Sequence, residues 1–160
     1  MNHLKTTLTL SAVAVTAAVL SFATVAPEPA FAHCQVPCGL YDDEGKFAEL
    51  NQHIATIEKA MAQITELSAK AAENQNQIIR WTINKESHAQ KIQDEISAYF
   101  LAQRLKLPEA GADKSGYLAH LELLHQITVY AMKCKQTTDP ANVAALKKSL
   151  SSYQAAYFKK

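Results

Sequence analysis

The residues best able to do chemistry lie in the short segment His33-Cys34-Gln35-Val36-Pro37-Cys38. This segment directly follows Ala30-Phe31-Ala32, a small-x-small sequence of the kind that signal peptidase cleaves. Cleavage after Ala32 would give His33 a free α-amine beside its imidazole, and two thiols would follow within the next five residues. Amine, imidazole and thiolate groups are donors that bind transition metals.

The spacing of these donors predicts a square-planar metal site. The α-amine of His33 with the backbone nitrogen and thiolate of Cys34 can close two adjacent five-membered chelate rings, and Cys38 can complete the plane. Pro37 and Gly39 suit the required hook, because proline fixes φ and glycine permits unusual angles. Nitrogen and thiolate donors in a plane favour Ni(II) or Cu(II) over tetrahedral zinc. Two thiolates and a deprotonated amide stabilise the higher oxidation state, and such a one-electron metal suits superoxide dismutation.

Residues 1–32 are predicted to be a cleaved signal peptide. Lys5 and the free amine give a charged start, residues 8–25 are apolar or small, and Pro27 and Pro29 precede the cleavage site. An uncleaved membrane anchor is the alternative, because about eighteen apolar residues could just span a bilayer. The prolines followed by Ala-x-Ala favour cleavage, and the lack of a twin-arginine favours general secretion through signal peptidase. We therefore expect a periplasmic or secreted protein of residues 33–160 with no stable membrane association.

The mature chain is predicted to fold as an all-α, antiparallel four-helix bundle. Four tracts carry apolar residues at alternating steps of three and four, the spacing of a core-facing helical stripe. The tracts are residues 44–72, 77–107, about 113–136, and a last one from Pro140 through Tyr157. The polar stretch 74–76 predicts the first turn, and Pro108 with Gly111 ends the second helix. Asp139 can cap the fourth helix, and Pro140 suits its first turn.

Length and charge narrow the class of protein further. The 160 residues allow one domain after the signal peptide, and the formal net charge of +1 without a long basic run argues against a nucleic-acid partner. The first two helices would each be near 30 residues, or about 45 Å long, which is long for a bundle of this size. We therefore expect further surface to be buried in a homo-oligomer.

The amino-terminal segment resembles the nickel-containing superoxide dismutases, whose hallmark is an amino-terminal His-Cys-x-x-Pro-Cys-Gly-x-Tyr hook. Residues 33–41 match it at every fixed position, and weaker similarity covers residues 80–86, 99–100 and 138–140. The resemblance implies a four-helix bundle that assembles as a homohexamer. It also implies an enzyme that converts superoxide to hydrogen peroxide and dioxygen through a Ni(III)/Ni(II) cycle, without an organic cofactor.

The resemblance also implies roles for individual residues around one nickel ion per chain. His33 would supply the amine and an axial imidazole, Cys34 a thiolate and its amide nitrogen, and Cys38 the second thiolate. Tyr41 would stand at the substrate channel close to the metal. Glu49 would hold the axial imidazole, as a group that orients a metal-bound histidine is expected to do.

Three further positions bear on the surroundings of the metal. Tyr99 would match a second tyrosine near the site in the family. The chain departs from relatives at Gln35, which is often acidic, and at His88, where some relatives place an arginine behind the glutamate. His88 could pair with Glu49, but its charge would vary with pH near neutrality. These departures affect the surroundings of the metal, not its ligands.

Two readings from other classes of protein stay open at the level of the sequence. A secreted protein could capture nickel or copper through the same hook without turnover, although Tyr41 and Glu49 favour the enzyme because capture needs neither. A structural bundle with a Cys34–Cys38 disulfide is the other reading, since an oxidising compartment allows that bond.

Other cysteine and histidine residues are expected to be structural or superficial. Cys134 is the odd cysteine, and a buried thiol near the end of the third helix is expected, with pairing between chains as the alternative. His53, His120 and His125 show no clear set of partners and are expected at the surface or its boundary.

Overall fold

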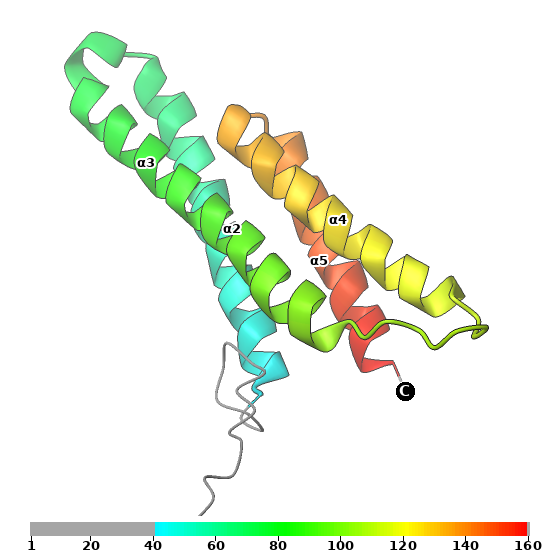
Figure 1. Ribbon diagram of the computed structural model, residues 1–160. Helices are drawn as coiled ribbons and strands as arrows, with labels where there is room; N and C mark the ends of the chain where they lie inside the picture. Colours follow the sequence, from blue (N-terminus) through cyan, green and yellow to red (C-terminus); the bar gives the residue numbers. More distant parts are fainter. Residues whose placement is uncertain (1–40, 160) are drawn as a thin grey trace, which may run out of the picture. The chain divides into compact units, whose positions relative to one another are not determined.

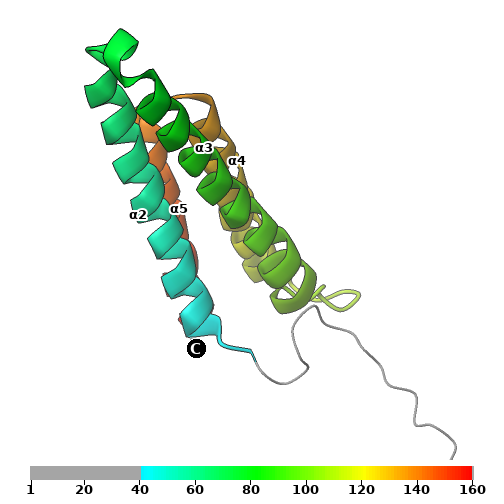
Figure 2. The same ribbon diagram turned by 90° about the vertical axis from the view of Figure 1, so that its left-hand side faces the viewer.

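A computed structural model describes residues 41–159, which form a helical bundle without strands in that range (Figure 1). The elements are α2 (Asp43–Ser68), α3 (Ala71–Glu95), the π-helical segment η1 (Ile96–Arg104), α4 (Ser115–Gln136) and α5 (Pro140–Phe158). α2 packs on α3, α4 packs on α5, and α3 with η1 packs against α4. The two views in Figures 1 and 2 show the two hairpins lying side by side along a common long axis. The predicted four-helix bundle is confirmed.

The first described helix, α2, begins at a capped and acidic end. The Asp42 carboxylate accepts a hydrogen bond from the backbone nitrogen of Gly45 at 2.8 Å, and Asp43 and Glu44 lie in the first turn, where negative charge suits the helix dipole. A Cβ at Gly45 would lie 2.2 Å from the Asp42 Oδ2, so glycine leaves room for this cap. The start of α2 is therefore fixed within a few residues of the predicted hook.

The first turn falls earlier than the sequence indicates. The prediction of a turn at residues 74–76 is wrong, because α2 ends at Ser68 and α3 begins at Ala71. The Asn74 side chain turns back across this junction and donates hydrogen bonds to the Leu67 oxygen at 3.4 Å and the Lys70 oxygen at 3.1 Å. The polar residues 74–76 thus lie inside α3, near its start, and the Asn74 side chain stabilises the preceding turn through its hydrogen bonds.

The second predicted helix is regular only in its first part. α3 passes into η1 at Ile96, and η1 ends at Arg104, so the helix stops three residues before the predicted end at Leu107. At the end of η1 the Leu105 nitrogen donates to the Phe100 oxygen at 2.8 Å, a bond between residues five apart. This is the hydrogen-bond pattern of a π-helix, which often marks a functional site. The connection from residue 105 to 114 includes Gly111 with φ of 84°.

The α4–α5 hairpin agrees with the prediction. α4 spans the expected residues, and the Asp139 carboxylate accepts a hydrogen bond from the Ala141 nitrogen at 2.9 Å, with Pro140 at the first position of α5. The buried Lys85 of α3 ties this hairpin to the other one. Its ammonium group donates to the Cys134 oxygen at 2.8 Å and the Thr137 oxygen at 3.2 Å, and so satisfies carbonyl groups at the end of α4.

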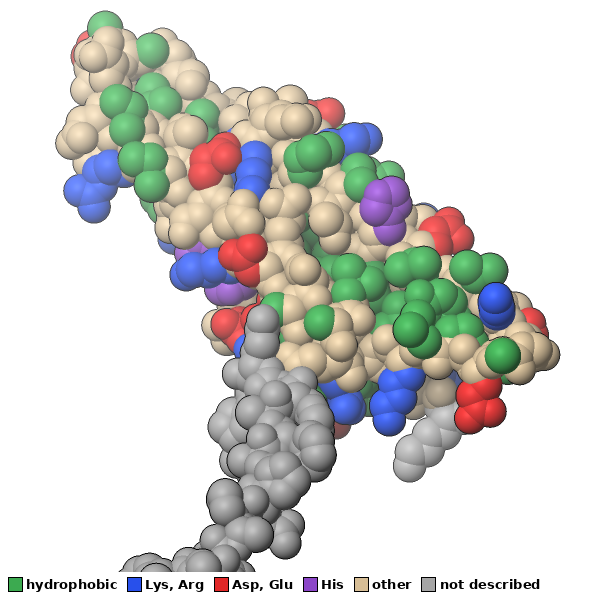
Figure 3. All heavy atoms as spheres, viewed as in Figure 1, with side chains coloured by type: hydrophobic (Ala, Val, Ile, Leu, Met, Phe, Trp, Pro, Cys, Tyr) green, Lys and Arg blue, Asp and Glu red, His purple; other side chains and the backbone are tan. Residues whose placement is uncertain are grey.

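The core follows the apolar stripes of all four helices. Its largest fully buried side chains are Phe47, Leu50, Ile54, Ile57, Ile92, Ile96, Phe100, Leu124, Ile127, Leu146, Leu150 and Tyr153. The stripe prediction fails for Ile79, Ile83 and Leu118, which are more than half exposed. Figure 3 shows hydrophobic side chains gathered on one face over η1 and α4. None of the helices within residues 41–159 is long and apolar enough to cross a membrane.

Candidate metal centre and its surroundings

The three predicted metal ligands lie outside the described residues. These are His33, Cys34 and Cys38, and the description begins at Tyr41, three positions further on. Within residues 41–159 no group of three or more His, Cys, Asp or Glu side chains could hold a metal ion. The donor types in the hook fit nickel by their chemistry, since two thiolates with an amine and an amide nitrogen would make a set that suits Ni(II).

Tyr41 contacts three residues of η1. Its hydroxyl donates to the Gln103 Oε1 at 3.2 Å, and the guanidinium carbon of Arg104 lies 4.5 Å from the centre of its ring. The ring of Tyr99 meets it edge-on, with 5.8 Å between centroids and an interplanar angle of 72°. The structure therefore brings together the two tyrosines that the family resemblance placed near the metal.

Asp43 is the centre of a hydrogen-bond network that includes Tyr99 and Arg104, the two residues whose side chains pack on the ring of Tyr41. Its Oδ1 accepts from the Tyr99 hydroxyl at 2.6 Å, and its Oδ2 accepts from the Tyr157 hydroxyl at 2.8 Å. Arg104 donates through Nη2 to the same Oδ2, and through Nε to the Tyr157 hydroxyl at 2.9 Å. One carboxylate thus joins the start of α2 to η1 and to the end of α5.

The network also fixes the protonation of its members. Burial alone would raise the pKa of Asp43, but hydrogen bonds from Tyr99, Arg104 and Tyr157 outweigh it and hold the pKa below its usual value. Burial and the hydrogen bond to Asp43 raise the pKa of Tyr99 far above the ordinary tyrosine range. Asp43 is therefore charged and Tyr99 neutral throughout the physiological range.

Glu49 lies further along α2, almost two turns after Asp43. Its Oε2 accepts a hydrogen bond from the Lys46 ammonium at 3.1 Å, and its side chain is 48% exposed. Lys46 also pairs with Glu95 at 2.7 Å and lies 5.6 Å from the ring centre of Tyr99. Lys46 thus connects Glu49 to the tyrosine cluster, which consists of Tyr41 and Tyr99.

His88 meets His53 at a hydrogen-bond distance. The two Nδ1 atoms are 2.9 Å apart, and the His53 Nε2 lies 3.8 Å from the Glu49 Oε1. The expectation that His53 has no clear partner is therefore wrong, and His53 stands between the two residues that were expected to pair. Burial lowers the pKa of both imidazoles, and for His88 the nearby His53 lowers it further.

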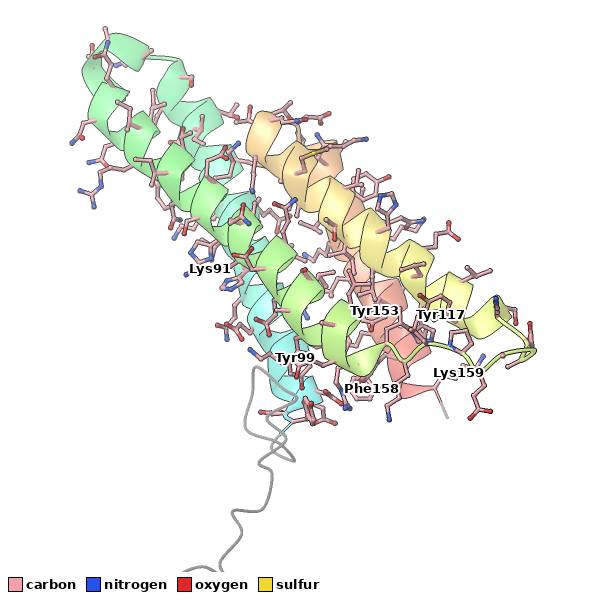
Figure 4. All side chains as sticks on the ribbon, viewed as in Figure 1. Lys91, Tyr99, Tyr117, Tyr153, Phe158 and Lys159 are labelled. Carbon is pink, nitrogen blue, oxygen red and sulfur yellow. The ribbon has the colours of Figure 1, made fainter. Side chains whose placement is uncertain are left out.

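These contacts form a polar seam between α2 and the α3–η1 helix. Figure 4 shows Tyr99 near the end of the bundle where α2 begins, and Lys91 further along α3. The sequence singled out Tyr41, Glu49 and Tyr99 but not Asp43 and Arg104, which the structure joins to the two tyrosines. The position of Asp43 two residues after the hook motif was a usable signal. No local pattern points to Arg104, because its contacts depend on the π-helical geometry of η1.

The described residues form an all-α bundle with a cluster of polar residues at the start of α2, which follows the cysteine-containing segment in the sequence. A sequence model of the family described as nickel-containing superoxide dismutase matches residues 28–160. The chain belongs to this family, so it is a superoxide dismutase that uses nickel as its cofactor and superoxide as its substrate. No curated protein and no solved structure gives a significant match.

Proposed function

We propose that this enzyme dismutates superoxide at a nickel site made by His33, Cys34 and Cys38 of a chain processed to begin at His33. The observation that carries the proposal is the position of Tyr41 within the network of Tyr99 and Arg104. Cys38 precedes Tyr41 by three residues, so their Cα atoms lie at most about 11 Å apart. This short link supports a metal site within reach of Tyr41 through Cys38.

His33, Cys34 and Cys38 would hold the nickel, which would supply a one-electron Ni(III)/Ni(II) couple for the conversion of two superoxide anions and two protons to dioxygen and hydrogen peroxide. Tyr41 and Tyr99 would line the approach to this site. Neither Tyr99 nor Asp43 can exchange protons readily near neutral pH, since the pKa of the phenol is raised and that of the carboxyl is lowered. Their role is to orient neighbouring groups, and the two protons come from elsewhere.

Glu49 is proposed to accept a hydrogen bond from the His33 imidazole. Lys46 engages the Oε2 of Glu49, and the partly exposed Oε1 lies 3.8 Å from the His53 Nε2. Carboxylates of this kind commonly orient histidine ligands and raise their basicity. Lys46 would hold this carboxylate in place while its other oxygen serves the imidazole.

Maturation and assembly belong to the same proposal. Signal peptidase would remove residues 1–32 and release the domain of residues 33–160 to the periplasm or the exterior, and one nickel would bind per chain. A homohexamer would bury apolar side chains that one chain leaves exposed. Among the described residues, the exposed side chains Ile79, Ile83, Leu107, Leu118, Met132 and Phe158 support this assembly.

The amino-terminal mechanism is tested by moving the α-amine away from His33. We would compare protein processed to His33 with protein that carries one additional glycine before it, since both contain the same thiols. The processed form should hold about one nickel per chain, consume superoxide and give a rhombic nickel resonance with nitrogen hyperfine coupling. The extended form should lose the signal and the activity. Full activity in the extended form contradicts the mechanism, and metal without turnover in the processed form would indicate a capture protein.

A further inference from the structure

We infer that Arg104 is a positioning residue for the dismutation: anchored on Asp43 and Tyr157, its guanidinium fixes the ring of Tyr41 and thereby the point where the metal-binding segment joins the bundle. The inference rests on the proposed function, because it assigns a role to contacts around a segment that is proposed to bind nickel. It is carried by the described contacts of Arg104, which link three parts of the chain far apart in sequence.

The anchoring of Arg104 leaves one face of its guanidinium for the tyrosine. Its Nη2 donates to the Asp43 carboxylate, and its Nε donates to the Tyr157 hydroxyl at 2.9 Å. Both hydrogen bonds lie in the plane of the guanidinium group, so its flat face can pack on an aromatic ring. The guanidinium carbon lies 4.5 Å from the ring centre of Tyr41, within the range of a cation–π contact.

The π-helical form of η1 explains how so many contacts converge. Tyr99 and Arg104 are five residues apart, and both bind the carboxylate of Asp43. In an α-helix, residues five apart point about 140° away from each other, because each residue turns the helix by about 100°. In a π-helix, residues five apart are joined across one turn, so they share a face. The distortion in η1 thus places Tyr99, Gln103 and Arg104 on the side that faces Tyr41.

A lysine at position 104 could not make the same set of contacts. An ammonium group can pair with Asp43, but it lacks the planar fork that bonds Asp43 and Tyr157 while stacking on Tyr41. The charge of Arg104 is already neutralised by Asp43, so attraction of the superoxide anion is not its main contribution. Its contribution is to hold the Tyr41 ring in one orientation.

The first experiment observes Tyr41 in the metal-free, processed protein. Tyrosine rings carrying ¹³C would be followed by NMR, with Tyr41→Phe identifying the Tyr41 signals. Arg104→Gln should shift and broaden these signals, and Arg104→Lys should not restore them although it keeps the positive charge. The control is Ile127→Val, a mildly destabilising core change in α4 that should leave the Tyr41 signals unchanged. If Arg104→Gln does not fold, Tyr157→Phe replaces it in this experiment, because this change removes only the Tyr157 hydroxyl, one of the two groups that anchor Arg104.

The second experiment measures how fast nickel leaves the loaded protein when a chelator is added. Arg104→Gln should release nickel about tenfold faster than the wild type, as expected for loss of a group that orients a metal site, whereas Ile127→Val should not. Unchanged Tyr41 signals, or changed signals with unchanged nickel release, overturn the inference. A wild-type protein that takes up no nickel contradicts the proposed function instead, and the metal-free Tyr41 signals then still decide whether Arg104 holds the ring.

Discussion

The two helical hairpins of this bundle are joined in different ways. The α2–α3 hairpin, with η1, carries a row of polar contacts along its seam: Asp43 with Tyr99, Lys46 with Glu95, and His53 with His88. The buried residues of α4 and α5 are almost entirely apolar, and they include Leu124, Ile127 and Ala131 of α4 and Val143, Leu146 and Leu150 of α5. The polar tie between them is a hydrogen bond of 3.3 Å from Ser149 to Gln126.

This difference separates two tasks in a small protein. Apolar burial stabilises a fold without fixing the direction of any one side chain, whereas hydrogen bonds and ion pairs fix directions but contribute little net free energy. Both hairpins contribute apolar side chains to the core, which supplies most of the stability, and the α4–α5 hairpin has little besides. The polar contacts of the α2–α3 seam also fix the directions of its side chains. Mutations in the two hairpins should accordingly affect different measurements.

The largest effect should come from the predicted ligands. Cys38→Ser replaces a thiolate by a weakly bound hydroxyl, so nickel binding and superoxide consumption should fall by more than about 100-fold, beyond the loss typical of supporting residues. Metal content and activity of the processed protein measure this. Cys134→Ala removes the buried thiol of α4 as a control and should keep its nickel; equal losses in both variants would contradict the assignment of the ligands.

Leu146→Ala tests the role of the apolar hairpin. Leu146 is fully buried in α5, so its truncation should lower the free energy of unfolding by about 2–5 kcal/mol. Chemical denaturation measures the loss, and the nickel resonance of the folded fraction should be unchanged. A changed resonance in this variant would show that the two hairpins do not divide the tasks.

Glu49→Gln tests the polar seam, where we expect a loss of activity with little change in stability. The side chain is half exposed, so stability should change by less than about 0.5 kcal/mol. Activity should fall about tenfold, because the amide can no longer orient the His33 imidazole as a charged acceptor. Glu58→Gln, at an exposed position of the same helix, is the matched control and should keep full activity. Wild-type activity in Glu49→Gln would remove this residue from the site.

Asp139→Ala tests the cap of α5. Loss of the hydrogen bond to the Ala141 nitrogen should cost about 1 kcal/mol of stability, and Asp139→Asn should retain most of it because an amide oxygen can still accept. Thermal unfolding compares the two variants. Equal losses in both would show that the charge at the helix end matters more than the hydrogen bond.

The smallest effect should be a pH dependence of the α2–α3 seam. Since burial lowers the pKa of His53 and His88 from 6.5, the folded protein binds fewer protons than the unfolded chain just below that pH. The contribution of the two histidines to stability is therefore present above pH 6.5, and it is lost as the pH falls through their lowered pKa values. A double His53→Gln, His88→Gln variant should show a flatter decline in denaturation midpoint over this range. An equally steep decline would assign it to other groups.

Local signals account for what could be predicted. Asp139 and Pro140 act within one turn of helix, so the start of α5 could be predicted from the sequence. The regular spacing of apolar residues likewise predicted α2. The turn near Asn74 was misplaced because the polar side chain bonds back across the junction from inside the helix. The π-helix of η1 has no comparable local pattern. The contacts of Asp43 join residues up to 114 positions apart, so they depend on the packed fold.

Cys134 carries a consequence for the lifetime of the enzyme. Its thiol is fully buried, and burial raises its pKa to about 11. Only about one molecule in ten thousand would carry a thiolate at neutral pH, and the thiolate is the form that peroxide and disulfides attack. With the proposed nickel site, hydrogen peroxide would form beside Cys34 and Cys38, and burial would shield Cys134 from this product. Oxidation by peroxide should then affect Cys34 and Cys38, which bound nickel would protect, so inactivation by peroxide should follow the loss of nickel.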